Sequence, residues 1–344
     1  MLRPLLLLCL VLSACAVPVE DAGSVEQAQI WDELAWLDVY SHPDPMLQQI
    51  ARESVGGIVD RRLVDGGSLR TLPLADFIDA AYGLPYCDEQ PFPDEPVLMN
   101  CSGALIDDDL FLTAAHCIPT QEYCDDYAIV FDYWRPAAGS IEPITNDDIY
   151  QCTEIVEISY LRDHAIVRLD RPVSSPHRPA FVRRGSDDLR SGDRLSIIGH
   201  PAGMPIKIDD TAAAVAFYSE GVESFEFKGD VVGGSSGAPI FTRDGEIVGV
   251  VSRSPEDDVK EQRDCIELRV EEDPTEPGTE IAGYVYRALH NLCRRGEGSA
   301  RLCADPDIWC PNCGGGGGCS TGGFGDAPVF LALLALLFVR RRKS

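Results

Sequence analysis

Short apolar runs, separated by Gly, Pro, Asp and Asn, recur along the middle of the chain between residues 97 and 253. Runs this short suit strands better than helices, and many of them in succession are typical of a β-rich fold. The runs are Val97–Met99, Leu110–Thr113, Ala128–Phe131, Ile155–Ile158, Ala165–Leu169, Leu195–Ile198, Ala212–Phe217, Pro239–Phe241 and Ile247–Val251. The pattern predicts an all-β sandwich or barrel.

Two segments have a helical pattern instead. Asp44 followed by Pro45 is typical of a helix N-cap and first helical position, which predicts a short helix over 45–52. Near the end of the β-rich region, six apolar residues fall on one face at helical spacing, which predicts a long closing helix. These residues are Ile281, Tyr284, Val285, Ala288, Leu289 and Leu292.

Residues 1–15 have the parts of an export signal. Arg3 supplies a positive start, Leu5–Leu12 is apolar, and small residues follow. The apolar run is too short to cross a bilayer as a permanent helix. Its end also resembles a bacterial lipobox, in which Cys15 would be lipidated, whereas ordinary cleavage would follow Ala16. Both interpretations predict export.

The other end of the chain has three parts. Residues 294–326 are rich in Gly and Cys and are expected to form a stalk, residues 327–339 are apolar, and residues 340–343 are basic. This order resembles the C-terminal sorting tags of myxobacterial surface proteins, which implies processing near Cys319, a surface-sorting machinery as partner, and display at the cell surface. The alternative is a plain anchor over 327–344, with the basic residues on the cytoplasmic side.

Composition adds three constraints. The 344 residues hold 56 Asp and Glu against 29 Lys and Arg, a formal net charge of −27, so the chain would repel nucleic acid rather than bind it. Thirteen cysteines are typical of an oxidising compartment. A hydrophobic content of 45% is that of a globular protein and excludes wholesale disorder.

Three segments carry candidate chemistry. The first ends in Leu-Thr-Ala-Ala-His116-Cys, the second begins at Asp163, and the third is the Gly-rich stretch around Ser236. A serine hydroxyl needs an adjacent base to remove its proton as it attacks. Histidine suits that role because it exchanges protons near neutral pH, and a carboxylate can orient the imidazole.

In the chain order His, Asp, Ser, these segments resemble the chymotrypsin-like serine peptidases, and residues 199–201 (Gly-His-Pro) resemble the bacterial glutamyl-endopeptidase-like branch. The resemblance covers residues 85–293. It implies an all-β fold of two six-stranded antiparallel β-barrels, with the active site in the cleft between them. It also implies hydrolysis of peptide bonds in protein or peptide substrates, without a cofactor or a metal ion.

The same resemblance assigns roles to individual residues. It implies that Ser236 is the nucleophile, that His116 is the general base and that Asp163 orients this base. The backbone N–H groups of Gly234 and Ser236 would form the oxyanion hole, where one donor is typically worth about 3–4 kcal/mol of activation barrier.

Substrate preference is predicted from the expected S1 pocket. Asp230 lies six residues before Ser236, the register of the acidic residue in trypsin-like pockets, so it would favour Lys or Arg at P1. Ser252 is expected to line the pocket, whereas the neighbouring Arg253 could neutralise Asp230. Val251 stands where glutamyl enzymes carry a histidine, which argues against strict Glu specificity.

Activation is expected to differ from that of the pancreatic enzymes. In those enzymes an Asp before the nucleophile pairs with a newly cut N-terminus, whereas this chain has Ser235 at that position. The ion pair is therefore not expected. The sequence leaves open whether residues 16–84 are a propeptide or part of the fold.

Two other functions stay open. Residues 233–237 (Gly-Gly-Ser-Ser-Gly) also fit the nucleophile elbow of α/β-hydrolases with Ser235 as the nucleophile, although only His290 follows as a base. The alternative that is not an enzyme is a surface binding module whose protease-like domain has lost turnover.

Cysteine pairing supports export. The resemblance implies a disulfide between Cys101 and Cys117, and Cys124 with Cys152 is a second candidate pair. Three of the thirteen cysteines lie in the predicted signal and sorting segments, so ten remain, an even set. Four cysteines near the stalk could form disulfides or hold zinc: Cys293, Cys303, Cys310 and Cys313.

Overall fold

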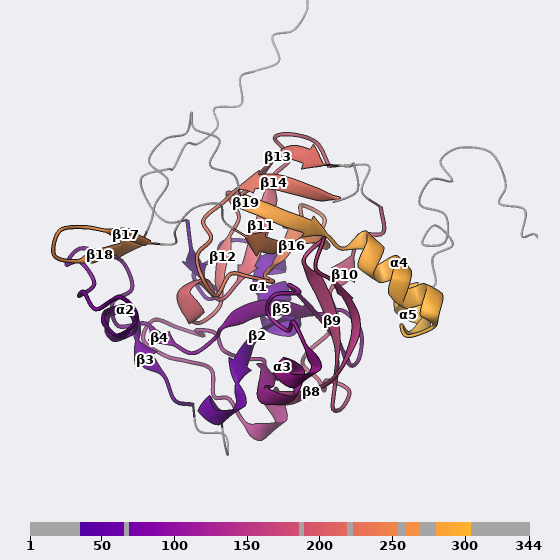
Figure 1. Ribbon diagram of the computed structural model, residues 1–344, viewed down its shortest axis with the longest axis horizontal. Helices are drawn as coiled ribbons and strands as arrows, with labels where there is room; N and C mark the ends of the chain where they lie inside the picture. Colours follow the sequence, from indigo (N-terminus) through magenta and orange to yellow (C-terminus); the bar gives the residue numbers. More distant parts are fainter. Residues whose placement is uncertain are drawn as a thin grey trace, which may run out of the picture.

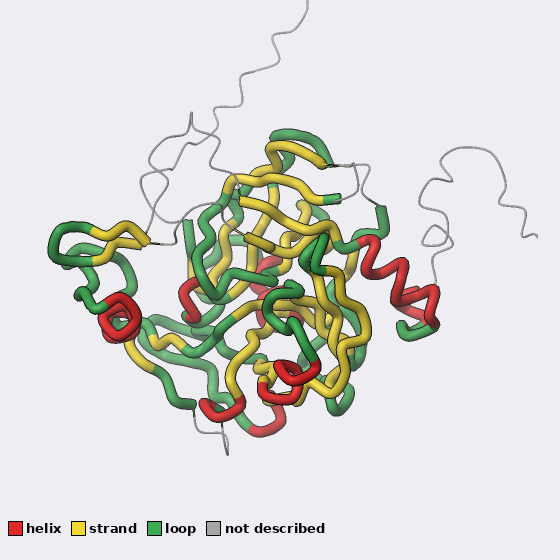
Figure 2. The backbone as a smooth tube through the Cα atoms, in the orientation of Figure 1, coloured by secondary structure: helices red, strands yellow, loops and turns green. Residues whose placement is uncertain are grey.

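The computed structural model of the chain describes residues 35–64, 69–185, 189–218, 223–253, 259–268 and 280–303. Strands dominate this part of the chain, and the helices are few and short (Figure 2). Residues 1–15, Cys15, Cys319 and the segment 327–344 lie outside the described residues, so what the sequence predicts for them stays a prediction.

Six strands form a closed antiparallel barrel. Its interior is apolar, and Ile58, Phe111 and Val167 are completely shielded from solvent. Burial of one such side chain contributes about 1.5–3 kcal/mol. In order around the barrel, the strands are β2 (Val55–Asp60), β5 (Cys101–Leu105), β6 (Leu110–Thr113), β9 (His164–Leu169), β8 (Ile149–Ser159) and β7 (Tyr127–Val130).

A nine-stranded sheet forms the second β-structure. An isolated bridge between Arg194, just before β11, and Ala213 brings β13 back towards β11, so the six strands from β11 to β13 curl into a half-barrel. The strands in order are β1 (Leu37–Asp38), β12 (Lys207–Asp209), β11 (Leu195–Gly199), β15 (Pro239–Thr242), β16 (Glu246–Arg253), β19 (Glu280–Tyr284), β14 (Ser224–Lys228) and β13 (Ala213–Tyr218), with β10 (Phe181–Val182) beside β16. The predicted all-β, two-barrel fold is confirmed.

The two β-structures lie next to each other (Figure 1), and buried side chains of both belong to one apolar core. Side chains from both β-structures and from helices α1 (Pro45–Ser54) and α4 (Tyr286–Arg295) belong to this core. Among them are Leu47, Leu112, Ile166, Ile198, Phe241 and Leu289. The two β-structures are therefore joined by a close-packed apolar interface, which fixes the loops at its edge relative to each other.

The helix predicted over residues 281–292 is wrong in its first part. Residues 280–284 form β19, which is hydrogen-bonded to β14 on one side and to β16 on the other, and α4 begins only at Tyr286. Gly283 lets this strand approach the first barrel, because a Cβ at this position would lie 2.0 Å from the backbone oxygen of Arg162. Apolar spacing along the chain could not reveal this contact between the barrels.

Residues ahead of position 85 contribute to both β-structures. The helix predicted after Asp44 is confirmed as α1, and the Asp44 side chain accepts a hydrogen bond from Met46 N. Strand β1 joins the second β-structure, and β2 closes the first barrel. Lys207 is buried with its ammonium against the carboxylates of Asp38 and Glu95.

A side lobe packs against these residues, at the left of Figure 1. A disulfide between Cys87 and Cys265 and a bridge between Tyr86 and Ile266 join its halves. The lobe consists of β3 (Leu72–Pro73), α2 (Leu74–Tyr82), β4 (Pro96–Val97), β17 (Val259–Glu261) and β18 (Ile266–Leu268). The remaining short elements are η1 (Arg61–Leu63), α3 (Gln121–Asp126), η3 (Asn146–Asp148), η4 (Pro201–Gly203) and α5 (Ala300–Cys303).

Disulfides pair eight cysteines of the described residues. Cys101 pairs with Cys117 and Cys124 with Cys152, as expected, and Cys124 lies on α3. The fourth disulfide joins α4 to α5 and thereby pairs two of the stalk-side cysteines. Several disulfides are typical of an extracellular or exported protein. In the described part of the chain, no helix combines the length and the apolar character that crossing a membrane requires.

Candidate active site

His116 stands on the loop that follows β6. The disulfide from Cys117 to Cys101 at the start of β5 ties this loop to the first barrel, with the two Cα atoms 6.2 Å apart. The imidazole side chain remains 47% exposed. The loop is therefore anchored while its histidine faces solvent, as a group that exchanges protons with a substrate requires.

Asp163 lies opposite His116, in the turn between β8 and β9. Its carboxylate contacts the histidine twice: Oδ2 is 2.8 Å from Nδ1 of the ring, and Oδ1 accepts a 3.0 Å hydrogen bond from the backbone N–H of His116. The hydroxyl of Ser252 on β16 donates to the same Oδ2 at 2.7 Å. The carboxylate thus contacts Nδ1 of the imidazole, and Nε2 takes no part in this contact.

The environment of Asp163 favours its charged form. Burial opposes ionisation, but the hydrogen bonds from His116 and Ser252 outweigh it and hold the pKa of this carboxyl below its ordinary value of 3.8. Asp163 is therefore a carboxylate at neutral pH. Such a group stabilises a positive charge on the imidazole beside it.

The second β-structure fixes the turn that carries Asp163. Glu223 pairs with Arg162 at 2.9 Å and also with Arg287 on α4. The backbone oxygen of Arg162 fits against Gly283, where any side chain would clash. The His116–Asp163 pair therefore depends on both β-structures.

Ser236 lies in a loop that two glycines make possible. Gly234 and Gly237 have φ values of +88° and +78°, a region that residues with a Cβ avoid. There is also no room for a Cβ, which would lie 2.4 Å from His200 O at Gly234 and 2.2 Å from Thr113 Oγ1 at Gly237. The Gly-rich motif is thus required by both conformation and packing.

Close packing brings this loop next to the histidine loop. Ser102 N–H donates to the backbone oxygen of Ser236 at 2.8 Å, and Cys117 Sγ lies 3.7 Å from the same oxygen. A Cβ on Gly237 would also lie 2.8 Å from Ala114 N, two residues before His116. The loops of Ser236 and His116 therefore adjoin, and Asp163 is paired with His116.

The two serines of the loop differ in accessibility. Ser235 is only 3% exposed, and its hydroxyl accepts a hydrogen bond from Val232 N–H at 3.3 Å. Ser236 is more exposed. Within the described residues, the backbone N–H groups of Gly234 and Ser236 donate no hydrogen bond. Two unused N–H donors, one of them from Ser236 itself, therefore lie next to the hydroxyl of the more accessible serine.

The residues expected at the substrate pocket make other contacts in the structure. One carboxylate oxygen of Asp230 accepts a 2.7 Å hydrogen bond from Ala35 N–H, and its backbone oxygen accepts one from the Trp36 indole. Ser252 directs its hydroxyl to Asp163 rather than to open space. Both residues are thus engaged by the protein itself.

Sequence reasoning gave no role to Ser102, which joins the parts of the site. Its Oγ donates to the backbone oxygen of Gly234 and accepts from His200 N–H, both at 2.8 Å. Burial lowers the pKa of His200 from 6.5 to about 4, and its Nδ1 lies 2.9 Å from Met204 O. In the sequence, the only sign that Ser102 lies near the site is that it follows Cys101, the expected disulfide partner of Cys117.

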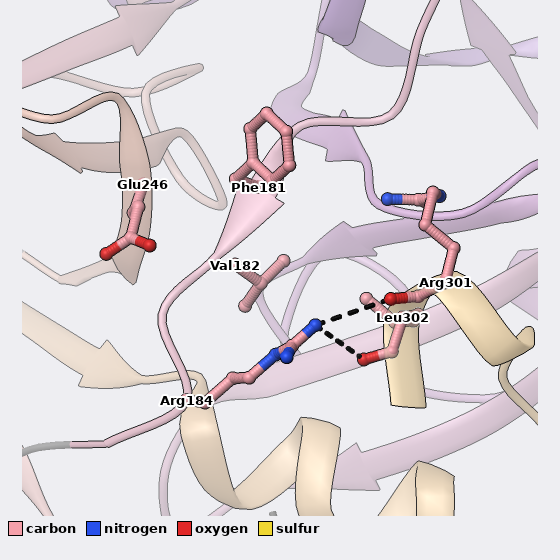
Figure 3. A pocket seen from close by; sticks show the side chains of 6 residues that line it. All are labelled: Phe181, Val182, Arg184, Glu246, Arg301 and Leu302. Atoms are coloured by element: carbon pink, nitrogen blue, oxygen red, sulfur yellow. Dashed lines mark hydrogen bonds between the residues drawn. The ribbon is translucent and has the colours of Figure 1, made fainter. Parts of the chain in front are cut away.

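Two further features of the described residues concern metal ligands and cavities. Cys101, His116 and Cys117 come close together, but the disulfide leaves no thiolate to bind a metal. A cavity of about 390 Å³ lies beside β10, and none of the predicted site residues lines it (Figure 3). It is lined by Phe181, Val182, Arg184, Glu246, Arg301 and Leu302.

Two solved structures and one family model are similar to this chain. The human heparin binding protein is similar in structure with 13% identity and a TM-score of 0.47, over 78% of this chain and 99% of the other. The inactive form of the Rv3671c protease has 14% identity and a TM-score of 0.43, over 74% and 93%. No curated protein matched the sequence. Residues 101–250, which include His116, Asp163 and Ser236, match the family model of the trypsin-like peptidase domain.

Proposed function

We propose that this chain is a serine endopeptidase in which Ser236 is the nucleophile, His116 the general base and Asp163 the residue that orients the base. The observation that carries the proposal is the His116–Asp163 pair, 2.8 Å apart, beside the loop of Ser236. The match of residues 101–250 to a peptidase domain supports the same reaction class.

The proposed reaction begins with transfer of the Ser236 hydroxyl proton to Nε2 of His116 as the oxygen attacks the peptide carbonyl. Asp163 accepts the Nδ1–H hydrogen bond, so that Nε2 is the nitrogen left to take the proton. The imidazolium then gives its proton to the leaving amine, and water releases the acyl group from Ser236 by the same route.

An oxyanion hole is part of the proposal. The backbone N–H groups of Gly234 and Ser236 are its candidate donors because neither is used within the described chain. Preorganised donors of this kind stabilise the negative charge that develops on the carbonyl oxygen, each by about 3–4 kcal/mol. The positive φ of Gly234 sets the direction of this backbone segment.

Labelling with a fluorophosphonate tests the proposal, because such a reagent reacts with a serine that a neighbouring base activates. The folded chain should be labelled, and Ser236→Ala should not. Loss of labelling in Ser235→Ala alone would favour the α/β-hydrolase alternative. Absence of labelling in the folded wild type would favour the binding module.

The preference for Lys or Arg at P1 forms a separate part of the proposal. Its support is the position of the half-buried Asp230 six residues before Ser236. The hydrogen bond from Ala35 N–H occupies one oxygen of the carboxylate, so Asp230 would act on P1 together with this N-terminal segment. A peptide library with every residue at P1 tests this; cleavage without an advantage for Lys and Arg rejects it.

We further propose that the chain is exported and displayed at the cell surface through its C-terminal segment. The four disulfides support export. Surface display rests on the sequence of residues 294–344 alone. Fractionation of cells that produce either the full chain or a chain without residues 327–344 tests export and surface display separately.

A further inference from the structure

A second cluster of ionisable side chains lies in the first barrel and contains none of the candidate active-site residues. Asp132 follows β7, Asp148 ends η3, and His177 stands in the segment between β9 and β10. One ligand atom from each side chain lies within 4.8 Å of the other two. Residues far apart in the sequence are thus gathered at one point.

His177 is the informative member of this cluster. Its side chain is 2% exposed, and within the described chain neither ring nitrogen has a hydrogen-bond partner. A buried imidazole without partners is costly unless something binds it. The ring packs on Phe131 with centroids 4.9 Å apart, which holds Nε2 3.5 Å from Oδ2 of Asp132.

The two carboxylates are held in place by other contacts. Asp132 Oδ1 accepts from the Trp134 indole at 3.2 Å, which leaves Oδ2 towards His177. Asp148 Oδ2 accepts from Thr145 N–H and Oγ1–H at 2.8 Å each. Each aspartate therefore has one oxygen that accepts hydrogen bonds and a second oxygen that accepts none within the described residues.

From this arrangement we propose that Asp132, Asp148 and His177 bind a divalent transition-metal ion of the Zn²⁺ type. Ligands about 2.1 Å from a tetrahedral ion stand about 3.4 Å apart, close to the observed separation of Nε2 and Oδ2. One imidazole and two carboxylates suit Zn²⁺, with water as the fourth ligand, whereas Ca²⁺ takes six to eight oxygens. The ion also neutralises two clustered negative charges.

Such an ion would clamp three segments of the chain. It would join the end of β7, the η3 turn and the segment that leads from the first barrel to β10. The hydrogen bond from Phe131 N–H to Asp148 O already joins two of them at 3.0 Å. The site is therefore structural, and its effect is expected on stability rather than on peptide hydrolysis.

Equilibrium dialysis of the oxidised full chain against Zn²⁺, after removal of metal with a chelator, tests the proposal. The wild type should bind one Zn²⁺ more than the Asp132→Asn and His177→Gln variants, and Zn²⁺ should raise its Tm but not theirs. Asp147→Asn is the matched control, because this exposed carboxylate neighbours Asp148 outside the cluster. It should bind like the wild type.

Cobalt substitution separates this site from cysteine sites elsewhere in the chain. Co²⁺ bound here should give a tetrahedral spectrum without thiolate charge-transfer bands. Fluorophosphonate labelling or near-ultraviolet circular dichroism verifies that each variant is folded. Equal Zn²⁺ binding by wild type and folded variants, no binding by the wild type, or binding that His177→Gln leaves unchanged would overturn the proposal.

Discussion

Nδ1 of His116 and Oδ2 of Asp163 lie 2.8 Å apart, although 47 positions separate the two residues in the sequence. Both belong to loops of the first barrel, yet the turn of Asp163 is held from the other side by Gly283 and Glu223. The geometry of the pair thus depends on the interface between the two β-structures. Changes at this interface are expected to affect activity as well as stability.

Replacement of Asp163 by Asn should lower kcat by about 10⁴-fold, because the amide can orient the imidazole in the wrong tautomer. Ser252→Ala removes only one hydrogen bond to the carboxylate, worth about 1.5–3 kcal/mol, and should lower kcat by about 10- to 100-fold. Steady-state hydrolysis of a peptide substrate measures both. Asp163→Asn with turnover near that of the wild type would show that Asp163 is not part of the machinery.

Gly237→Ala should destabilise the protein and abolish labelling of the serine loop. The added Cβ meets Thr113 and Ser102 at 2.2 and 2.4 Å, in addition to the cost of a left-handed φ. Gly139→Ala is the control, because Gly139 has a similar φ of +73° but open space around it. It should cost only about 1–2 kcal/mol. If urea unfolding gave the same loss of unfolding free energy for both variants, the packing argument would be contradicted.

Acid should destabilise the fold through His200. Its pKa is about 4 in the folded chain against an ordinary 6.5, so the unfolded state binds more protons between these values. The contribution is complete above pH 6.5 and is lost as the pH falls towards 4, by up to about 3 kcal/mol.

Urea unfolding at a series of pH values measures this loss. His200→Gln cannot take up the proton, so its stability should fall less steeply over the same interval. Parallel curves for the variant and the wild type would mean that His200 does not cause the decline.

A chain that begins at residue 85 should fail to fold. It lacks β2, one of the six strands that close the first barrel, and it lacks β1 with the Asp38 partner of Lys207. The buried lysine would then lose a counter-ion, which is strongly destabilising. Circular dichroism and fluorophosphonate labelling measure the outcome; a folded, labelled product would instead support removal of the whole of residues 16–84 as a propeptide.

The sequence predicted those features that short segments determine. Runs such as Leu110–Thr113 form strands because the fold buries both faces of the strand and the side chains on both faces are apolar. The cap at Asp44 started α1 as expected. The motifs around His116 and Ser236 carry local requirements, a disulfide partner and two glycines, and these requirements are visible in the sequence.

Features that depend on tertiary contacts could not be predicted. Residues 281–284 fit a helical face, but pairing with β14 and β16 and the contact of Gly283 with Arg162 make them a strand. The roles of Ser102 and of the Asp132 cluster arise from residues brought together only by folding. No spacing along the chain records such contacts.

The measurement that tests the proposed function most directly is mass-spectrometric mapping of the fluorophosphonate adduct on the folded chain. The account predicts one modified residue, Ser236, with labelling lost in Ser236→Ala and largely retained in Ser235→Ala. An adduct on Ser235, or labelling that persists in Ser236→Ala, would contradict it.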